Sequence, residues 1–306
     1  MNKLAFLFSG QGAQKQGMAQ DLADKYPIVA RTFAESSEIL GYDLATLINA
    51  DDGRLNETQF TQPAILTTSI ALYRLIIAET DLRPDAVAGL SLGEYSALVA
   101  AGALDFATAV SLVAQRGALM SQMQSGKMVA ILGTDTALIE EACGEASSLG
   151  IVSPANYNTP AQTVIGGETQ AVDKALELLQ AAGSKKQIEL KVSGPFHTAL
   201  MAPAAAEFAK ILETTAFHDF NVPLVSNTTG KIMAQDEIRT LLTRQMQEPV
   251  RWVDSIQTMT KNLGITRFIE VGPGKVLSGF VKKIAPEASD ISNVEDFESF
   301  RKLVNA

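Results

Sequence analysis

Residues 84–98 read PDAVAGLSLGEYSAL, and this stretch decides the fold. A short apolar run at 86–88 meets Gly-Leu-Ser-Leu-Gly at 89–93, and residues 94–101 are typical of a helix. Strand, tight turn and helix form the setting in which G-x-S-x-G places a serine on a nucleophile elbow. The glycines remove side chains that would collide with strand and helix, and the helix N-terminus offers free N–H groups to an oxyanion. We therefore predict that Ser91 is a nucleophile; a plain turn of small residues is the alternative.

A serine nucleophile needs a base at neutral pH, and the chain has only two histidines that could serve. His197 follows a Gly-Pro-Phe sequence at which a strand-like run gives way to a helical pattern, and site residues gather at such junctions. His218 lies in a polar and aromatic segment. We predict that His197 is the base.

Composition excludes several classes of protein. At 306 residues the chain can form one large domain or two unequal ones, and its 46% hydrophobic and 19% charged content is typical of a soluble globular enzyme. The apolar stretch at 69–78 is too short for a membrane span, and the net charge of −9 argues against nucleic-acid binding. A single cysteine, Cys143, fits a reducing cytoplasm, and cysteine and histidine are too scarce for a metal cluster. We expect a cytoplasmic protein with no bound metal or cofactor.

The order of predicted elements indicates an inserted domain. Residues 128–192 read as strand, helix, two strands, helix and strand, which is the ferredoxin-like split unit. The rest alternates strands and helices, which implies a mainly parallel sheet flanked by helices. We therefore predict an α/β fold: a large hydrolase-like domain of residues 1–126 and 195–306, with a small inserted ferredoxin-like α+β domain of residues 127–194. Further expectations in the large domain are helices at 21–40, at 61–77 with Pro63 in the first turn and at 106–123 with Asp105 as the cap, and a strand at 222–227.

Seven ordered motifs together resemble the malonyl-CoA:acyl carrier protein transacylases, an acyltransferase family of fatty-acid and polyketide synthesis. The resemblance covers nearly the whole chain. The motifs are FSGQGAQ at 8–14, GLSLGEY at 89–95, QRG at 115–117, SPANYN at 153–158, GPFH at 194–197, RQ at 244–245 with PVRW at 249–252, and EVGPG at 270–274.

The resemblance implies a role for each matching residue of the catalytic centre. Ser91 resembles the serine that is acylated, and His197 the base that activates it. Gln245 matches the position whose backbone carbonyl orients the histidine in place of an aspartate. The backbone N–H groups of Gln11 and Leu92 match the oxyanion hole.

The resemblance also implies substrate-binding residues. Arg116 matches the arginine that pairs with the malonyl carboxylate, whereas the sequence pattern alone leaves open a side chain that extends to solvent. Phe196 resembles the residue that favours malonyl over methylmalonyl, and Asn156 lies in a motif near the site. The family often has histidine directly before the serine, where this chain has Leu90; we expect altered local hydrogen bonding there and no loss of activity.

The resemblance implies transfer of malonyl from malonyl-CoA to the phosphopantetheine thiol of acyl carrier protein, in two steps through a malonyl-Ser91 ester. Expected partners are a coenzyme A thioester and the carrier protein, for a monomeric enzyme. Because the chain is acidic overall, an acidic carrier protein needs a local basic patch. Two clusters are candidates: Lys185 and Lys186 with Lys191, and Lys282 and Lys283 with Lys275. Alternatives are a serine esterase or thioesterase, malonyl loading for a polyketide pathway, and a non-enzymatic acyl-carrier scaffold.

Overall fold

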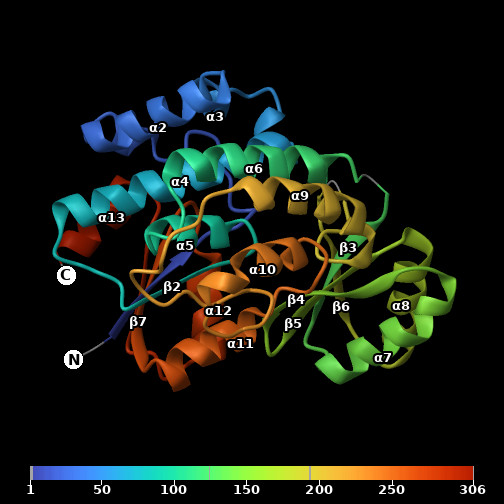
Figure 1. The fold of residues 1–306 in the computed structure, drawn as a ribbon. Helices are drawn as coiled ribbons and strands as arrows, with labels where there is room; N and C mark the ends of the chain where they lie inside the picture. Colours follow the sequence, from blue (N-terminus) through green and yellow to red (C-terminus); the bar gives the residue numbers. More distant parts are fainter. Residues whose placement is uncertain (1–2, 124, 193, 306) are drawn as a thin grey trace.

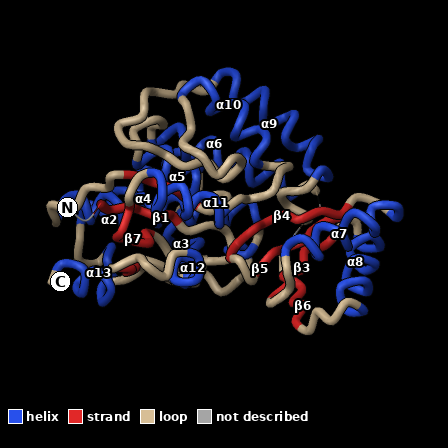
Figure 2. Tube along the Cα trace, turned by 90° about the horizontal axis from the view of Figure 1, so that it is seen from below, coloured by secondary structure: helices blue, strands red, loops and turns tan. Residues whose placement is uncertain are grey.

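A computed structural model of the chain describes residues 3–123, 125–192 and 194–305. Residues 1–2, 124, 193 and 306, which fall inside the predicted domain ranges, lie outside the described residues. The described chain forms an α/β fold in which a parallel sheet and a small antiparallel sheet lie side by side (Figures 1 and 2). The predicted fold class is confirmed.

The central sheet is parallel throughout and consists of short apolar strands. In spatial order these are β2 (Ala86–Gly89), β1 (Lys3–Phe8), β7 (Ile265–Val271) and β8 (Asp290–Val294). Alternate residues of β1 pack on opposite faces: Phe6 and Phe8 join one buried cluster, and Ala5 and Leu7 join another. Because both faces are buried, the strand is apolar at every position after Lys3.

Helices cover the central sheet on both faces (Figure 1). In the part of the large domain that precedes the small sheet, the helices are α1 (Gln20–Ala23), α2 (Pro27–Leu40), α3 (Leu44–Asn49), α4 (Thr58–Glu79), α5 (Gly93–Ala100) and α6 (Phe106–Ser121). In the part that follows the small sheet, the helices are α9 (Ala202–Thr214), α10 (Ile238–Gln245), α11 (Trp252–Gln257), α12 (Val276–Ile284) and α13 (Phe297–Val304). Short turns of 3-10 or π helix lie at Arg54–Asn56, Ser147–Leu149, Ala199–Met201, Gln235–Glu237 and Thr258–Asn262.

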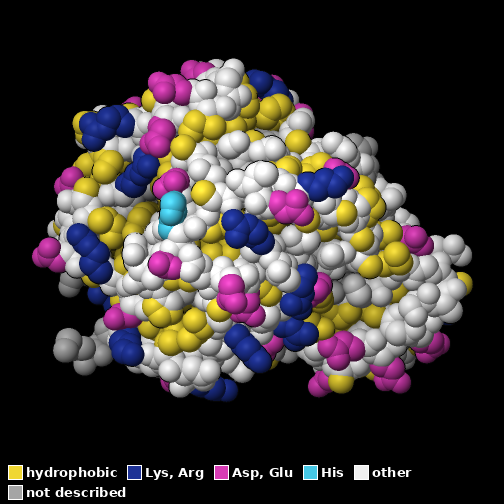
Figure 3. Space-filling model, viewed as in Figure 1, with side chains coloured by type: hydrophobic (Ala, Val, Ile, Leu, Met, Phe, Trp, Pro, Cys, Tyr) yellow, Lys and Arg dark blue, Asp and Glu magenta, His cyan; other side chains and the backbone are white. Residues whose placement is uncertain are grey.

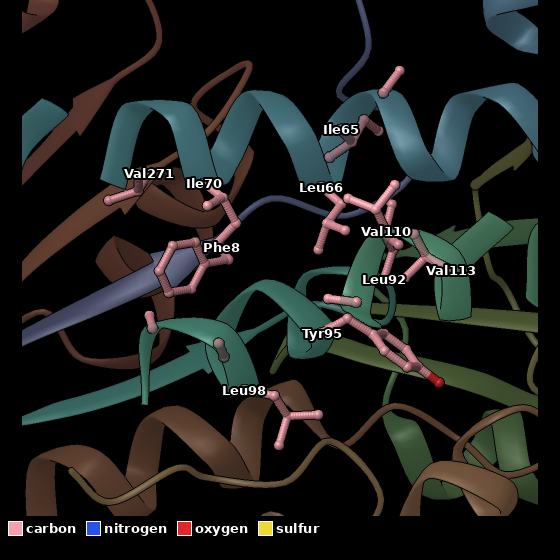
Figure 4. Close-up of a cluster of buried hydrophobic side chains, with 14 of the residues drawn as sticks. Phe8, Ile65, Leu66, Ile70, Leu92, Tyr95, Leu98, Val110, Val113 and Val271 are labelled. Atoms are coloured by element: carbon pink, nitrogen blue, oxygen red, sulfur yellow. The ribbon is translucent and has the colours of Figure 1, made fainter. Parts of the chain in front are cut away.

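Helix α5 leaves the central sheet through the core. It packs against α4 and α6, and its Tyr95 and Leu98 belong to the same buried cluster as Leu66 of α4 and Val113 of α6 (Figure 4). Among the described helices, α4 is long and apolar enough to cross a membrane, but 78% of its apolar stretch is buried inside the protein. This burial is the pattern of a core helix.

The small sheet has the ferredoxin-like strand order. Its antiparallel strands are β4 (Val152–Thr159), β5 (Gln162–Gly167), β3 (Lys127–Leu132) and β6 (Lys186–Glu189), with α7 (Thr136–Ala146) and α8 (Thr169–Ala181) on one face. Val129 and Ile131 of β3 face those helices, whereas Met128 and Ala130 join the core of the large domain. These elements fall within residues 127–194, and the exact domain boundaries stay a prediction.

Four local expectations were wrong, each for a local reason. The helix expected at 21–40 is interrupted because Pro27 holds Tyr26 in an extended conformation, with φ −122° and ψ 106°. Helix α4 begins three residues before the expected start, so Pro63 lies inside it. Asp105 stands at the N-cap of α6 but makes no capping hydrogen bond. Residues 222–227 form only isolated bridges beside β2, and Pro223 has no N–H to extend the pairing.

Candidate active site

Ser91 stands on a strained turn between β2 and α5. Its φ is 52°, in the left-handed region that residues other than glycine seldom adopt. A Cβ on Gly89 would lie 2.0 Å from the Gly93 carbonyl carbon, and one on Gly93 would lie 2.1 Å from the Phe8 oxygen. The two glycines therefore let β1, β2 and α5 approach closely enough to present the serine at the carboxyl edge of the sheet.

His197 faces the serine. Its Nε2 lies 2.8 Å from Ser91 Oγ, and its Nδ1 lies 2.6 Å from the backbone oxygen of Gln245. A carbonyl oxygen only accepts, so Nδ1 carries the hydrogen and Nε2 is free to accept the serine proton. Burial, together with the charge of Arg116, lowers the pKa of His197 to about 4. The imidazole is therefore neutral at pH 7, as a base must be.

His218 lies elsewhere. It is exposed on the surface, where its Nε2 is 3.2 Å from Asp105 Oδ2. The geometry therefore brings only one of the two histidines to Ser91.

Arg116 of α6 points into the protein. It is 1% exposed, and its guanidinium donates to Gln62 Oε1 at 2.7 Å and to Gln245 Oε1 at 3.0 Å. A terminal nitrogen lies 3.4 Å from Ser91 Oγ, and Nε has no protein acceptor among the described residues. Burial lowers the pKa of Arg116, because removal from water disfavours the charged guanidinium. A cation held beside the nucleophile with an N–H to spare is arranged to receive an anion.

The residues expected at the oxyanion hole lie on both sides of Ser91. The loop after β1 carries Gln11, and a Cβ on the preceding Gly10 would lie 2.3 Å from the Leu90 oxygen. Leu92 follows the serine and is the N-cap of α5. Both amides thus belong to segments in contact with the elbow, and their role in binding an oxyanion stays a prediction.

A cleft of about 340 Å³ opens between the two domains next to the elbow. It is lined by residues of the loop after β1, by Leu90, by Asn156 and Asn158 of β4, by the segment after β6 and by the start of α12. Asn158 Oδ1 is buried there without a partner among the described residues. Phe196 is buried directly before His197. The expected lysines are all exposed, and one of them, Lys191, lines the cleft.

Sequence reasoning missed two polar residues of the site. Asn227 accepts the Ser91 N–H at 2.5 Å through Oδ1 and donates through Nδ2 to the Gly89 oxygen at 2.6 Å. Glu94 is fully buried in the first turn of α5, and burial raises its pKa to about 7. The one available signal was an acidic residue directly after G-x-S-x-G in an otherwise small and apolar segment.

Fold and comparisons together define a class of protein: an α/β acyltransferase, in which Ser91 stands on a turn with the geometry of a nucleophile elbow. The model of the acyl transferase domain family matches residues 5–302. The chain is 47% identical over 289 residues to the malonyl CoA-acyl carrier protein transacylase of Escherichia coli K12, covering 93% of each chain. The chain therefore belongs to the acyl transferase family, within the group of malonyl CoA-acyl carrier protein transacylases.

Solved structures agree with this assignment. The MCAT of Streptococcus pneumoniae is 57% identical, with a TM-score of 0.96 over 99% of both chains. A malonyl-transacylase solved in complex with a type II PKS acyl-carrier protein is 42% identical, with a TM-score of 0.95 over 99% of both chains.

Proposed function

We propose that this enzyme transfers the malonyl group from malonyl-CoA to the phosphopantetheine thiol of acyl carrier protein and so supplies fatty-acid synthesis. The observation that carries the proposal is a neutral imidazole 2.8 Å from Ser91 Oγ with a buried guanidinium 3.4 Å from the same oxygen. The imidazole activates the serine, and the guanidinium selects an acyl group that ends in a carboxylate.

In the first half-reaction, Ser91 Oγ attacks the thioester carbon while His197 Nε2 takes the hydroxyl proton. The developing oxyanion is bound by the backbone N–H groups of Gln11 and Leu92. Collapse breaks the carbon–sulfur bond, the imidazolium returns its proton to the coenzyme A thiolate, and a malonyl-Ser91 ester remains. In the second half-reaction the carrier-protein thiol gives its proton to His197 and attacks the ester carbon. The bond from that carbon to Ser91 Oγ breaks, the imidazolium returns its proton to Oγ, and the malonyl group remains on the carrier-protein sulfur.

Arg116 and Phe196 set the choice of acyl group in this proposal. The guanidinium pairs with the malonyl carboxylate, and the spare Nε–H completes a bidentate contact. The buried ring of Phe196 opposes an α-methyl group, for which a pocket gives about 10- to 200-fold discrimination. Asn156 and Asn158 line the cleft through which the pantetheine arm enters.

Mass spectrometry tests the reaction class. Brief mixing with malonyl-CoA should place one malonyl group on the peptide that contains Ser91, and holo-carrier protein should then remove it to its own thiol. The Ser91→Ala variant should take up none. Release of free malonate without transfer would identify an esterase or thioesterase, and malonylation of Ser91→Ala at another residue would refute the choice of nucleophile. Comparison of carrier proteins from fatty-acid and polyketide pathways by kcat/KM decides which pathway is served.

We further propose that the carrier protein docks on two clusters of exposed lysines: Lys185, Lys186 and Lys191, and Lys275, Lys282 and Lys283. Acidic and basic side chains alternate over the face in Figure 3, so attraction must be local. Lys282 and Lys283 are exposed at the end of α12, the helix whose first residues line the cleft, whereas Lys185 and Lys186 stand at the start of β6, the end away from it.

Charge reversal at either lysine pair should slow transfer to carrier protein more than acylation by malonyl-CoA. The effect should shrink with salt, because the Debye length is already about 8 Å at 0.15 M. Lys210→Glu is the control, because this exposed lysine on α9 pairs with Glu207 and lies outside the cleft. Unchanged kcat/KM for carrier protein in both reversals at low salt would place docking elsewhere. The proposal describes a cytoplasmic monomer without a cofactor, and size-exclusion chromatography with light scattering tests its oligomeric state.

A further inference from the structure

Glu94 is a buried carboxylate whose two oxygens face donors of the protein itself. Its side chain is 0% exposed in the first turn of α5. Oε1 accepts the backbone N–H of Asn227 at 2.9 Å, and Oε2 accepts a hydrogen bond from Gln245 Nε2. A buried carboxylate is costly unless its oxygens are satisfied, so these two N–H donors, together with the Ser226 hydroxyl, hold it in place.

The same two residues hold the backbone of Ser91. Asn227 Oδ1 accepts the Ser91 N–H at 2.5 Å, and Gln245 Nε2 donates to the Ser91 oxygen at 3.0 Å. The nucleophile has a φ of 52°, a conformation that persists only where its surroundings over-determine it. Both polar backbone groups of the strained residue are therefore bound by side chains of residues that Glu94 holds, Asn227 through its backbone N–H and Gln245 through its side-chain amide.

Gln245 also joins Glu94 to Arg116. Its Oε1 accepts from the Arg116 guanidinium at 3.0 Å, while its Nε2 faces the Glu94 carboxylate. An anion on one side and a cation on the other determine which way the amide points, because a carboxylate only accepts and a guanidinium only donates.

Building on the proposed malonyl transfer, we propose that Glu94 is a positioning residue that, as a carboxylate, orients Asn227 and Gln245 and through them both the nucleophile and the carboxylate-binding arginine. Its negative charge also offsets the buried charge of Arg116 before the malonyl group arrives.

The isosteric change Glu94→Gln separates orientation from packing. The glutamine amide has one oxygen that accepts and one NH₂ group that donates, whereas the site presents N–H donors from Asn227 and Gln245. In either orientation of the amide, its NH₂ group therefore faces one of these N–H donors. If the Gln245 amide turns to compensate, its nitrogen faces the Arg116 guanidinium and its oxygen faces the Ser91 oxygen. Each arrangement disturbs either the elbow or the arginine, although the volume of the side chain is unchanged.

We expect that protonation of the Glu94 carboxylate causes the fall of activity on the acid side of the pH profile. Burial raises the pKa of Glu94 to about 7. Hydrogen bonds from Asn227, Gln245 and Ser226 and the positive charge of Arg116 act in the opposite direction and lower it. Tyr95 is the other titratable side chain beside this group. As pH falls through about 7, Glu94 takes up a proton and one oxygen ceases to be an acceptor, so activity falls. His197, whose pKa is lowered to about 4, stays neutral throughout this range.

The experiment measures single-turnover acylation of Ser91 from pH 5.5 to 8.5 by intact mass. The acyl donor is malonyl-pantetheine, because it lacks the phosphates of coenzyme A and titrates no group of its own in this range. Wild type, Glu94→Gln and His218→Ala are compared, the last because His218 is the exposed histidine outside the site.

We expect kcat/KM of wild type and His218→Ala to fall at least tenfold between pH 8.5 and 5.5. Glu94→Gln should be at least tenfold slower than wild type at pH 8.5, a change equal to about 1.4 kcal/mol, and should show no acid limb in this range. Wild-type rates in Glu94→Gln, or a reduced rate with the acid limb retained, would overturn the inference. If Glu94→Gln does not fold, the pH profile of wild type tests the inference by itself, and a rate that does not change between pH 8.5 and 5.5 would overturn it. Absence of malonylation in wild type would remove the proposed function itself, an outcome distinct from the others.

Discussion

Arg116→Ala should cost the enzyme its preference for a malonyl group. The guanidinium is buried, and it is held by Gln62 and Gln245 in a fixed position beside Ser91 Oγ. In the variant the malonyl carboxylate would be buried in the same place without a partner. We expect a higher KM for malonyl-CoA and weaker discrimination against acetyl-CoA.

The magnitude follows from the burial of the site. Removal of one member of a buried charge pair costs about 3–5 kcal/mol, which corresponds to about 150- to 5,000-fold in kcat/KM. The amide oxygens of Gln62 and Gln245 also lose a donor, but that loss is common to both substrates and costs stability at about 1–3 kcal/mol for each unsatisfied group. Only the lost pairing between the malonyl carboxylate and Arg116 distinguishes malonyl-CoA from acetyl-CoA.

The assay compares single-turnover acylation by malonyl-CoA and acetyl-CoA in wild type, Arg116→Ala and Arg74→Ala. Arg74 is a control arginine, half-exposed on α4, that pairs with Glu35 at 2.6 Å and stacks on Phe106. Arg74→Ala should leave the ratio of the two rates unchanged. Equal losses for both acyl donors in Arg116→Ala would refute a carboxylate-binding role and make the arginine a structural residue.

Three further predictions test the fold and the base. His197→Ala should lose most acylation activity while His218→Ala keeps it, and the reverse result would show that the wrong histidine is assigned. Gly93→Ala should lower the Tm, because its Cβ would lie 2.1 Å from a backbone oxygen of β1. Gly144→Ala, whose Cβ would meet nothing within 4 Å, should raise the Tm slightly. Equal shifts of the Tm by calorimetry would contradict the close packing at the elbow. Burial raises the pKa of Cys143 to about 12, so iodoacetamide at pH 8 should label this thiol only after unfolding in urea, and rapid labelling of the native protein would show that the thiol is accessible.

Local sequence determined the elements that depend on near neighbours. The run at 84–98 specified strand, turn and helix because glycine spacing and apolar periodicity act over a few residues. The ferredoxin-like order at 128–192 followed from the same periodicity. Where the prediction failed, as at Tyr26 and at 222–227, a proline restricted the backbone in a way that apolar periodicity alone does not register.

Only the tertiary structure decided the partners of the site's polar side chains. Asn227 lies 136 residues from Ser91 along the chain, and Gln245 lies 151 residues from Glu94. In the sequence, each looks like an ordinary polar residue at the end of an element, because a side-chain amide or carboxylate carries no mark of its distant partner. Packing of α5 against β1, and of the segment around Leu224 against β2, brings these residues together. Asn227, Gln245 and Glu94 are buried there, so each donor needs an acceptor within the protein. The sequence by itself thus predicted Ser91 as the candidate nucleophile and determined the local fold, and tertiary packing determined the network that holds Ser91 in place.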